Sequence, residues 1–184
     1  MAIKLNKGGS YNLTKEEPAL KKIMIGLGWD SGKGLDLDAS VFLLGQNLKL
    51  PAEGFFVFYN NLRSPDGAVQ HTGDNRTGVG DGDDEMILLN LDLVDNHVHE
   101  ILIVASIYDA EIRNHNFGLL KDAYIRLYDV ENKREILQYD LDALYPDATI
   151  VEFGKIHRIG TEWKFTAMGL GSEKGLQGLV DIYA

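Results

Sequence analysis

The sequence consists of many short segments with strand periodicity and has few segments with helical periodicity. Residues 36–44 alternate between the two faces of a strand, and residues 101–108 are apolar on both faces and rich in β-branched side chains, which is typical of a central strand. The helices of 10–15 residues that parallel crossovers require are missing from the pattern. We therefore predict an all-β fold, an antiparallel β-sandwich with a few short helical turns.

Turn signals separate the predicted elements. Residues 54–60 and 86–91 are predicted as further strands, and two pairs of segments have the spacing of hairpins: 123–130 with 134–139, and 151–158 with 162–168. Short helical turns are predicted at 116–122 and 141–144, and the tail 172–183 is predicted as a short helix or an edge segment.

Size and composition restrict the class of protein. The 184 residues, 45% hydrophobic and 25% charged, predict one globular domain spanning residues 1–184. Cysteine is absent, which excludes disulfides, thiolate metal sites and a cysteine nucleophile. A net charge of −10 disfavours nucleic acid as a partner, and anionic lipid unless a cation intervenes. No apolar stretch is long enough for a membrane span or a secretory signal, so we expect a cytoplasmic protein that is not an integral membrane protein.

The densest chemistry lies in residues 73–85, a glycine-rich segment with five carboxylates between positions 74 and 85. Two unit charges about 4 Å apart interact by about 1 kcal/mol in water and about 4 kcal/mol at an effective dielectric near 20. Carboxylates held together in such a loop therefore repel one another unless a cation binds. Calcium takes carboxylate, amide and backbone carbonyl oxygens, all of which this segment offers.

A second acidic element precedes the first. Asp36 and Asp38 have the same strand parity, so we expect both carboxylates on one face, and Asp30 lies in a glycine-flanked turn that can reach the same end. The segment is not an EF-hand, because a template begun at Asp81 places Met86 where the loop needs glycine. The competing interpretation is that Asp and Gly only form solvated turns. The predicted metal ligands are Asp30, Asp36, Asp38, Asn61, Asp74, Asn75, Asp81, Asp83, Asp84 and Glu85.

A series of motifs, in order along nearly the whole chain, resembles the TerD family of tellurium-resistance and stress proteins. The motifs are Gly26-Leu27-Gly28-Trp29-Asp30, Asp36-Leu37-Asp38-Ala39-Ser40, Phe58-Tyr59-Asn60-Asn61-Leu62, His71-Thr72-Gly73-Asp74-Asn75, Gly80-Asp81-Gly82-Asp83-Asp84-Glu85, Ile107-Tyr108-Asp109-Ala110 and Asn116-Phe117-Gly118. Val79 and Gly34 depart from the family pattern, which often has Glu and Asp there.

The resemblance implies a calcium-binding β-sandwich that holds one or two ions through the acidic elements. It also implies a bacterial, cytosolic protein linked to resistance to tellurite and chemical stress, with no established catalysis. We expect its partners to be other TerD-type or stress-complex proteins at the inner membrane surface.

Two other functions compete with a calcium-binding stress module. One is a metal-dependent hydrolase that uses the same acidic loops, with His71 as the candidate base. The other is a module that docks on anionic lipid or on a partner through calcium. The pair His97 and His99 has a spacing compatible with zinc, but we predict a surface role for it.

Overall fold

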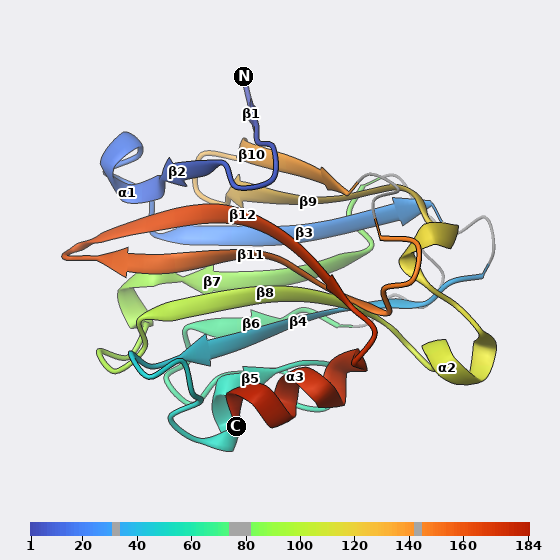
Figure 1. Ribbon diagram of the computed structural model, residues 1–184. Coiled ribbons are helices and arrows are strands. Elements are labelled where there is room, and N and C mark those ends of the chain that lie inside the picture. The colour runs from blue at the N-terminus through green and yellow to red at the C-terminus, as the bar shows by residue number, and fades with distance from the viewer. Residues whose placement is uncertain (31–33, 74–81, 142–144) are drawn as a thin grey trace.

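The computed structural model describes residues 1–30, 34–73, 82–141 and 145–184. Within these residues the chain forms two packed six-stranded sheets, here called sheet A and sheet B (Figure 1). Sheet A has the order β1 (Ile3–Lys4), β10 (Arg134–Leu141), β9 (Lys121–Asp129), β3 (Lys22–Asp30), β7 (Glu85–Asn90) and β6 (Val69–His71). Sheet B has the order β2 (Ser10–Asn12), β12 (Glu162–Ser172), β11 (Ile150–Ile159), β8 (Glu100–Ile107), β4 (Leu37–Leu44) and β5 (Phe56–Val57).

The predicted antiparallel sandwich is confirmed. Both predicted hairpins form, as β9 with β10 and β11 with β12, and β8 lies inside sheet B between β11 and β4. Among the described strands only the short β1 pairs in parallel, with β10. The helical segments are short: α1 (Leu13–Glu16), α2 (Ala110–Arg113), α3 (Gly175–Tyr183), η1 (Glu53–Phe55), η2 (Leu91–Leu93) and η3 (Phe117–Leu119). No helix among the described residues is both long and apolar enough to cross a membrane.

The main core lies between the sheets and follows the period of two that the sequence shows. Ile25 and Leu27 of β3 face Val41 of β4 and Phe165 of β12 in one continuous buried cluster. Each is at most 2% exposed. Burying a side chain of this size contributes about 1.5–3 kcal/mol relative to leaving it exposed, so the alternation along the strands fixes which face of each sheet points inward.

A second, smaller core lies on the outer face of sheet B, beneath α3 (Figure 1). Phe42 of β4 stacks on Phe56 with 4.3 Å between ring centroids, and Tyr183 of α3 lies 5.4 Å from Phe42. Of the two alternatives for the tail, the structure therefore has the helix, over Gly175–Tyr183. Leu179 supplies the buried residue of its apolar face.

Three predicted elements need comment. The strand predicted at 54–60 is reduced to Phe56–Val57, because the Asn61 side chain donates hydrogen bonds to the carbonyl oxygens of Gly54 (3.1 Å) and Phe56 (2.6 Å) and draws the chain into a turn. The turn predicted within 116–122 is present as η3. Positions 142–144, in the turn predicted at 141–144, lie outside the described residues.

Candidate functional site

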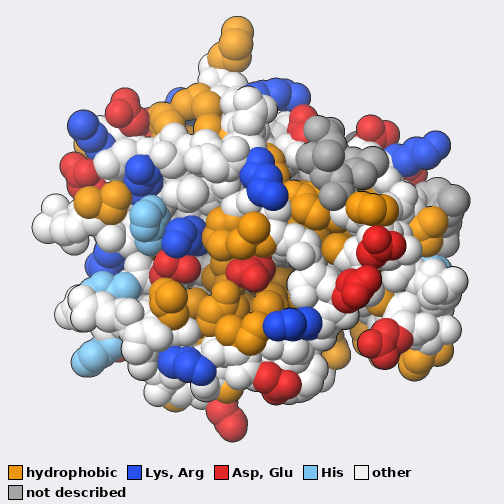
Figure 2. Space-filling model, in the orientation of Figure 1, with side chains coloured by type: hydrophobic (Ala, Val, Ile, Leu, Met, Phe, Trp, Pro, Cys, Tyr) orange, Lys and Arg blue, Asp and Glu red, His pale blue; other side chains and the backbone are white. Residues whose placement is uncertain are grey.

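Most of the predicted ligands that the structure describes lie at one end of the sandwich. Strands β3, β6 and β8 end there, and β4, β7 and β9 begin there, as the pairs Leu27–Glu85 and Leu37–Ile107 require. We call this the acidic end and define it by Asp30, Asp36, Asp38, Asp83, Asp84 and Glu85. Figure 2 shows acidic side chains gathered on the side of the molecule where α2 lies. The predicted ligands Asp74, Asn75 and Asp81 lie outside the described residues.

Glu85 points into the sandwich. Its side chain has no exposed surface, and its Oε2 lies 3.0 Å from Nε2 of His71, whose side chain is equally buried. The same oxygen accepts the backbone N–H of Ala39 at 3.3 Å. Because Nδ1 of His71 accepts the N–H of Gly73 (3.1 Å), a neutral imidazole carries its proton on Nε2, facing Glu85. Glu85 thus connects β7 and β6 of sheet A to β4 of sheet B.

Asp83 lies on the opposite, outer face of sheet A. Both carboxylate oxygens accept from Nε of Arg126, at 2.8 and 3.0 Å, and Oδ1 also accepts from the hydroxyl of Tyr124 at 3.2 Å. Burial first, and the Asp83 charge second, raise the pKa of Tyr124 to about 12. Arg126 donates in addition to Glu135 at 3.1 Å. The negative charge of Asp83 is therefore already balanced by a guanidinium.

Asp84 differs from both of its neighbours. Its Oδ2 accepts the backbone N–H of Trp29 at 2.9 Å, and it makes no ion pair with any described residue. Burial raises the pKa of this carboxyl, and the charges of Asp83 and Glu85 raise it further, against the lowering effect of the Trp29 N–H. Asp84 is thus a buried carboxylate whose charge is not balanced by a described cation.

The remaining predicted ligands approach from sheets A and B. Asp38 is 5% exposed and lies on the outer face of sheet B, because Leu37 and Ala39 on either side pack into the main core. Its charge contributes, after burial, to the raised pKa of Tyr59. Asp30 is exposed and is the last residue of β3, so the prediction that it lies in a glycine-flanked turn is wrong. Asn61 uses its amide nitrogen to close the turn after β5.

The structure thus brings the described candidates to one end but distributes them over different faces. Glu85 faces the interior, Asp83 the outside of sheet A and Asp38 the outside of sheet B. Consistent with this, no three His, Cys, Asp or Glu side chains of the described residues are grouped closely enough to hold a metal ion. His97, paired with Asp95 at 2.8 Å, has an 88% exposed side chain.

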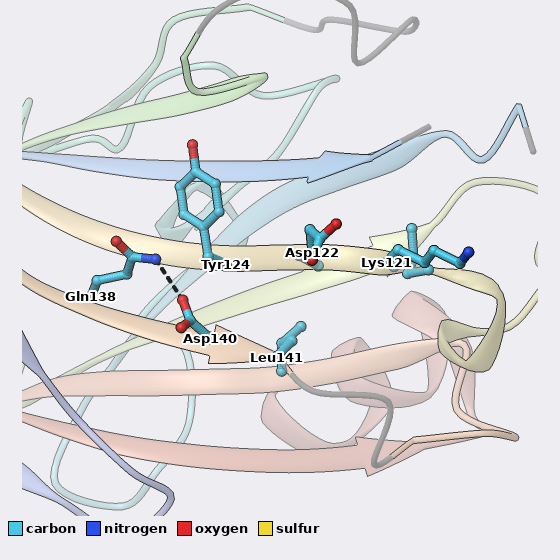
Figure 3. A pocket seen from close by; sticks show the side chains of 8 residues that line it. Lys121, Asp122, Tyr124, Gln138, Asp140 and Leu141 are labelled. Atoms are coloured by element: carbon cyan, nitrogen blue, oxygen red, sulfur yellow. Dashed lines mark hydrogen bonds between the residues drawn. The ribbon is translucent and has the colours of Figure 1, made fainter. Parts of the chain in front are cut away.

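Sequence reasoning missed Arg126 and Tyr124. Both lie on the outer face of β9, and their side chains lie across β3 at Gly26 and Gly28, the glycines of the motif at 26–28. Figure 3 shows Tyr124 directed toward β3 and away from Asp140, at the side of a hollow of about 550 Å³ between β9 and β10. The available signal was the pair of glycines at alternate positions, Gly26 and Gly28, because a glycine inside a strand marks a place where other side chains approach the backbone; no strand was predicted there.

Comparison with known proteins gives consistent results over the full chain. The TerD domain family model matches residues 1–183. The tellurium resistance protein TerD of Serratia marcescens is 45% identical over 187 residues, which cover 100% of this chain and 97% of that protein. General stress protein 16U of Bacillus subtilis (strain 168) is 41% identical over 188 residues, covering 100% and 97% of the two chains.

A solved structure shares the fold. The crystal structure of a homologue of telluride resistance protein (TerD) from Streptomyces coelicolor A3(2) superposes with a TM-score of 0.70. The match covers 88% of this chain and 96% of that chain, at 19% sequence identity. At this identity the similarity concerns the arrangement of strands alone.

Proposed function

The chain belongs to the TerD family of tellurium-resistance and stress-response proteins, and we propose that it acts in that response as a calcium-binding module. The observation that carries the proposal is Asp84, a buried carboxylate with a raised pKa and no basic partner among the described residues, at the end of the sandwich where the other described candidates lie. A cation bound beside it would remove the cost of keeping this group ionised.

The donor set fits a hard divalent cation. Carboxylate oxygens are offered by Asp30 at the end of β3, Asp36 just before β4, Asp38 in β4 and Asp84 just before β7. Cysteine is absent from the chain. Calcium prefers six to eight oxygen ligands of this kind, whereas softer metals prefer sulfur or imidazole. Asp74, Asn75 and Asp81 remain predicted ligands beside these four. Bound calcium would supply positive charge that holds the carboxylates together.

Calcium is expected to stabilise the folded protein. A ligand that binds only the native state contributes about 2.7 kcal/mol at a hundredfold excess over its Kd, which for a chain of this size corresponds to a rise in Tm of about 5–10 °C. Thermal unfolding in calcium and in EDTA, together with calorimetric titration of the metal-free protein, measures the shift, the affinity and the number of ions. Identical unfolding curves and no binding heat would contradict the proposal.

Replacing Asp84 by Asn should separate stability from binding. The amide oxygen can still accept the Trp29 N–H, but the desolvated charge is gone, so the metal-free variant should melt at a higher temperature than the wild type. The same variant should lose most of the calcium-induced rise in Tm. Asp92→Asn is the matched control, because Asp92 is 61% exposed in a surface pair with Lys21 and should change neither quantity. A variant that is less stable without metal and equally responsive to calcium would argue against a ligand role.

We propose binding in place of catalysis as the biochemical role. The hydrolase alternative depends on His71 as a base at the surface, but the imidazole is buried and directed at Glu85. A base must lie within reach of the proton it removes. We further propose a cytoplasmic location and partners among other TerD-type or stress-complex proteins at the inner membrane surface.

A further inference from the structure

We propose that Arg126 is a positioning residue for the acidic end, which anchors Asp83 so that the following residue, Asp84, is directed to the metal, and that Asp83 is not itself a ligand. The inference rests on the calcium site proposed above. It departs from the prediction, made from the sequence, that Asp83 belongs to the ligand set.

The contacts of Asp83 already satisfy its charge. Nε of Arg126 lies within 3.0 Å of both carboxylate oxygens, the hydroxyl of Tyr124 lies 3.2 Å from Oδ1, and the Asp83 side chain is only 6% exposed. Charge-assisted hydrogen bonds of this kind are shorter and stronger than neutral ones. Arg126 is also held by Glu135 at 3.1 Å, so the ion pair is fixed from both sides and a calcium ion would compete with the guanidinium for the Asp83 charge.

The glycine motif at 26–28 leaves the space for this arrangement. A Cβ atom on Gly26 would collide with the Asp83 carboxylate, and a Cβ on Gly28 would collide with the Tyr124 ring. Both approaches are far inside van der Waals contact, so any side chain at these positions would move Asp83 or Tyr124 off β3. Figure 3 shows the Tyr124 ring directed from β9 toward β3. The motif thus has a structural explanation that does not involve a nucleotide or a metal.

Anchoring Asp83 determines where Asp84 points. With Asp83 on the outer face of sheet A, the backbone N–H of Asp84 donates to the carbonyl oxygen of Leu27 at 2.8 Å, and its Oδ2 accepts the N–H of Trp29 at 2.9 Å. The first bond extends the backbone pairing of β3 with β7 beyond its last pair, Leu27–Glu85, and the second ties the Asp84 side chain to β3. Without the Arg126 contact, Asp83 would no longer be fixed on sheet A, and the two hydrogen bonds between Asp84 and β3 would be weakened.

Calorimetric titration of Arg126→Gln with calcium gives opposite results for the two roles. If Arg126 positions Asp84, its removal lowers calcium affinity, and we expect a decrease of about tenfold with the number of ions unchanged. If Asp83 is instead a calcium ligand whose binding Arg126 opposes, removal of Arg126 raises the calcium affinity. Unchanged affinity would overturn the inference as well. Arg126→Lys should recover part of the loss, and Arg134→Gln, which removes an arginine from a surface pair with Glu17, is the matched control.

A double-mutant cycle tests the role of Asp83. We expect Asp83→Asn to lower the affinity about as much as Arg126→Gln, and the double variant to be no worse than either, because all three remove the same anchor. Additive losses, or the loss of one bound ion in Asp83→Asn alone, would show that Asp83 is a ligand.

Amide hydrogen exchange in EDTA tests the positioning without metal. Arg126→Gln should accelerate exchange of the Trp29 N–H, which is bonded to Asp84, and leave that of Ile103 in β8 unchanged. Unaltered exchange at Trp29 would refute the inference even if calcium binds. A wild type that binds no calcium would instead refute the proposed function, and the exchange experiment would still report on the anchor.

Discussion

A Glu85→Ala variant is expected to lose about 3–5 kcal/mol of unfolding free energy whether calcium is present or not. The side chains of Glu85 and His71 have no exposed surface and face each other at 3.0 Å. Removing Glu85 leaves the buried imidazole N–H without its acceptor, which costs about 1–3 kcal/mol, and the cavity left by the side chain adds to that loss. The Ala39 N–H also loses its acceptor. Denaturant unfolding of the metal-free protein, with Glu111→Ala on the exposed surface of α2 as the control, measures the effect.

The same variant distinguishes a structural from a ligating role for Glu85. If Glu85 were chiefly a calcium ligand, its replacement would leave metal-free stability nearly unchanged and abolish the calcium-induced shift. We expect instead that the variant loses much of its metal-free stability and keeps most of its calcium-induced rise in Tm. A His71→Leu/Glu85→Leu double variant should lose less than the sum of the two single variants, because an apolar pair leaves neither group buried without a partner. Additive losses would mean that the two residues do not act as a pair.

Most of the sandwich was predictable because most of its long strands carry their own evidence, but β3 was not predicted, since the glycines at 26 and 28 are typical of a loop. A period of two in residues 36–44 decides which side chains face the core, and the structure has Leu37, Ala39, Val41 and Leu43 inside as that period requires. The two predicted hairpins are local, so their short turns fix which strands pair. The shortened β5 was not predictable in this way, because a side chain outside the strand, that of Asn61, ends it.

The acidic end was predictable as a location but not as a geometry. The sequence shows that three acidic residues follow one another at 83–85, and so it predicts where acidic side chains are concentrated. It does not show that the side chains of Asp83 and Glu85 lie on opposite faces of sheet A. That depends on partners distant in sequence, Arg126 for Asp83 and His71 for Glu85. Counting carboxylates assumes that none of them is already paired. Of the three, Asp84 has no described ion pair, and it could be recognised only after the other two had been placed.

Phe42→Ala is expected to cost about 3–5 kcal/mol and to loosen α3 first. Phe42 is fully buried and contacts both Phe56 and Tyr183, so its removal opens a cavity between sheet B and the helix that cannot collapse completely. Equilibrium unfolding measures the loss. Amide exchange should show the largest local increase in Gly175–Tyr183, since this helix contributes only one buried side chain, Leu179.

Ile182→Ala is the matched control, because Ile182 lies on the same helix but is 43% exposed, and its truncation should change stability by no more than about 0.5 kcal/mol. The acidic end should be little affected by Phe42, because Asp84 is held by β3 of the other sheet and because Asp36 and Asp38 lie around the start of β4, four or more residues before Phe42. Calcium affinity measured below the transition should therefore match the wild type. A large drop in affinity would mean that the two cores are coupled and that the helix on sheet B contributes to the metal site.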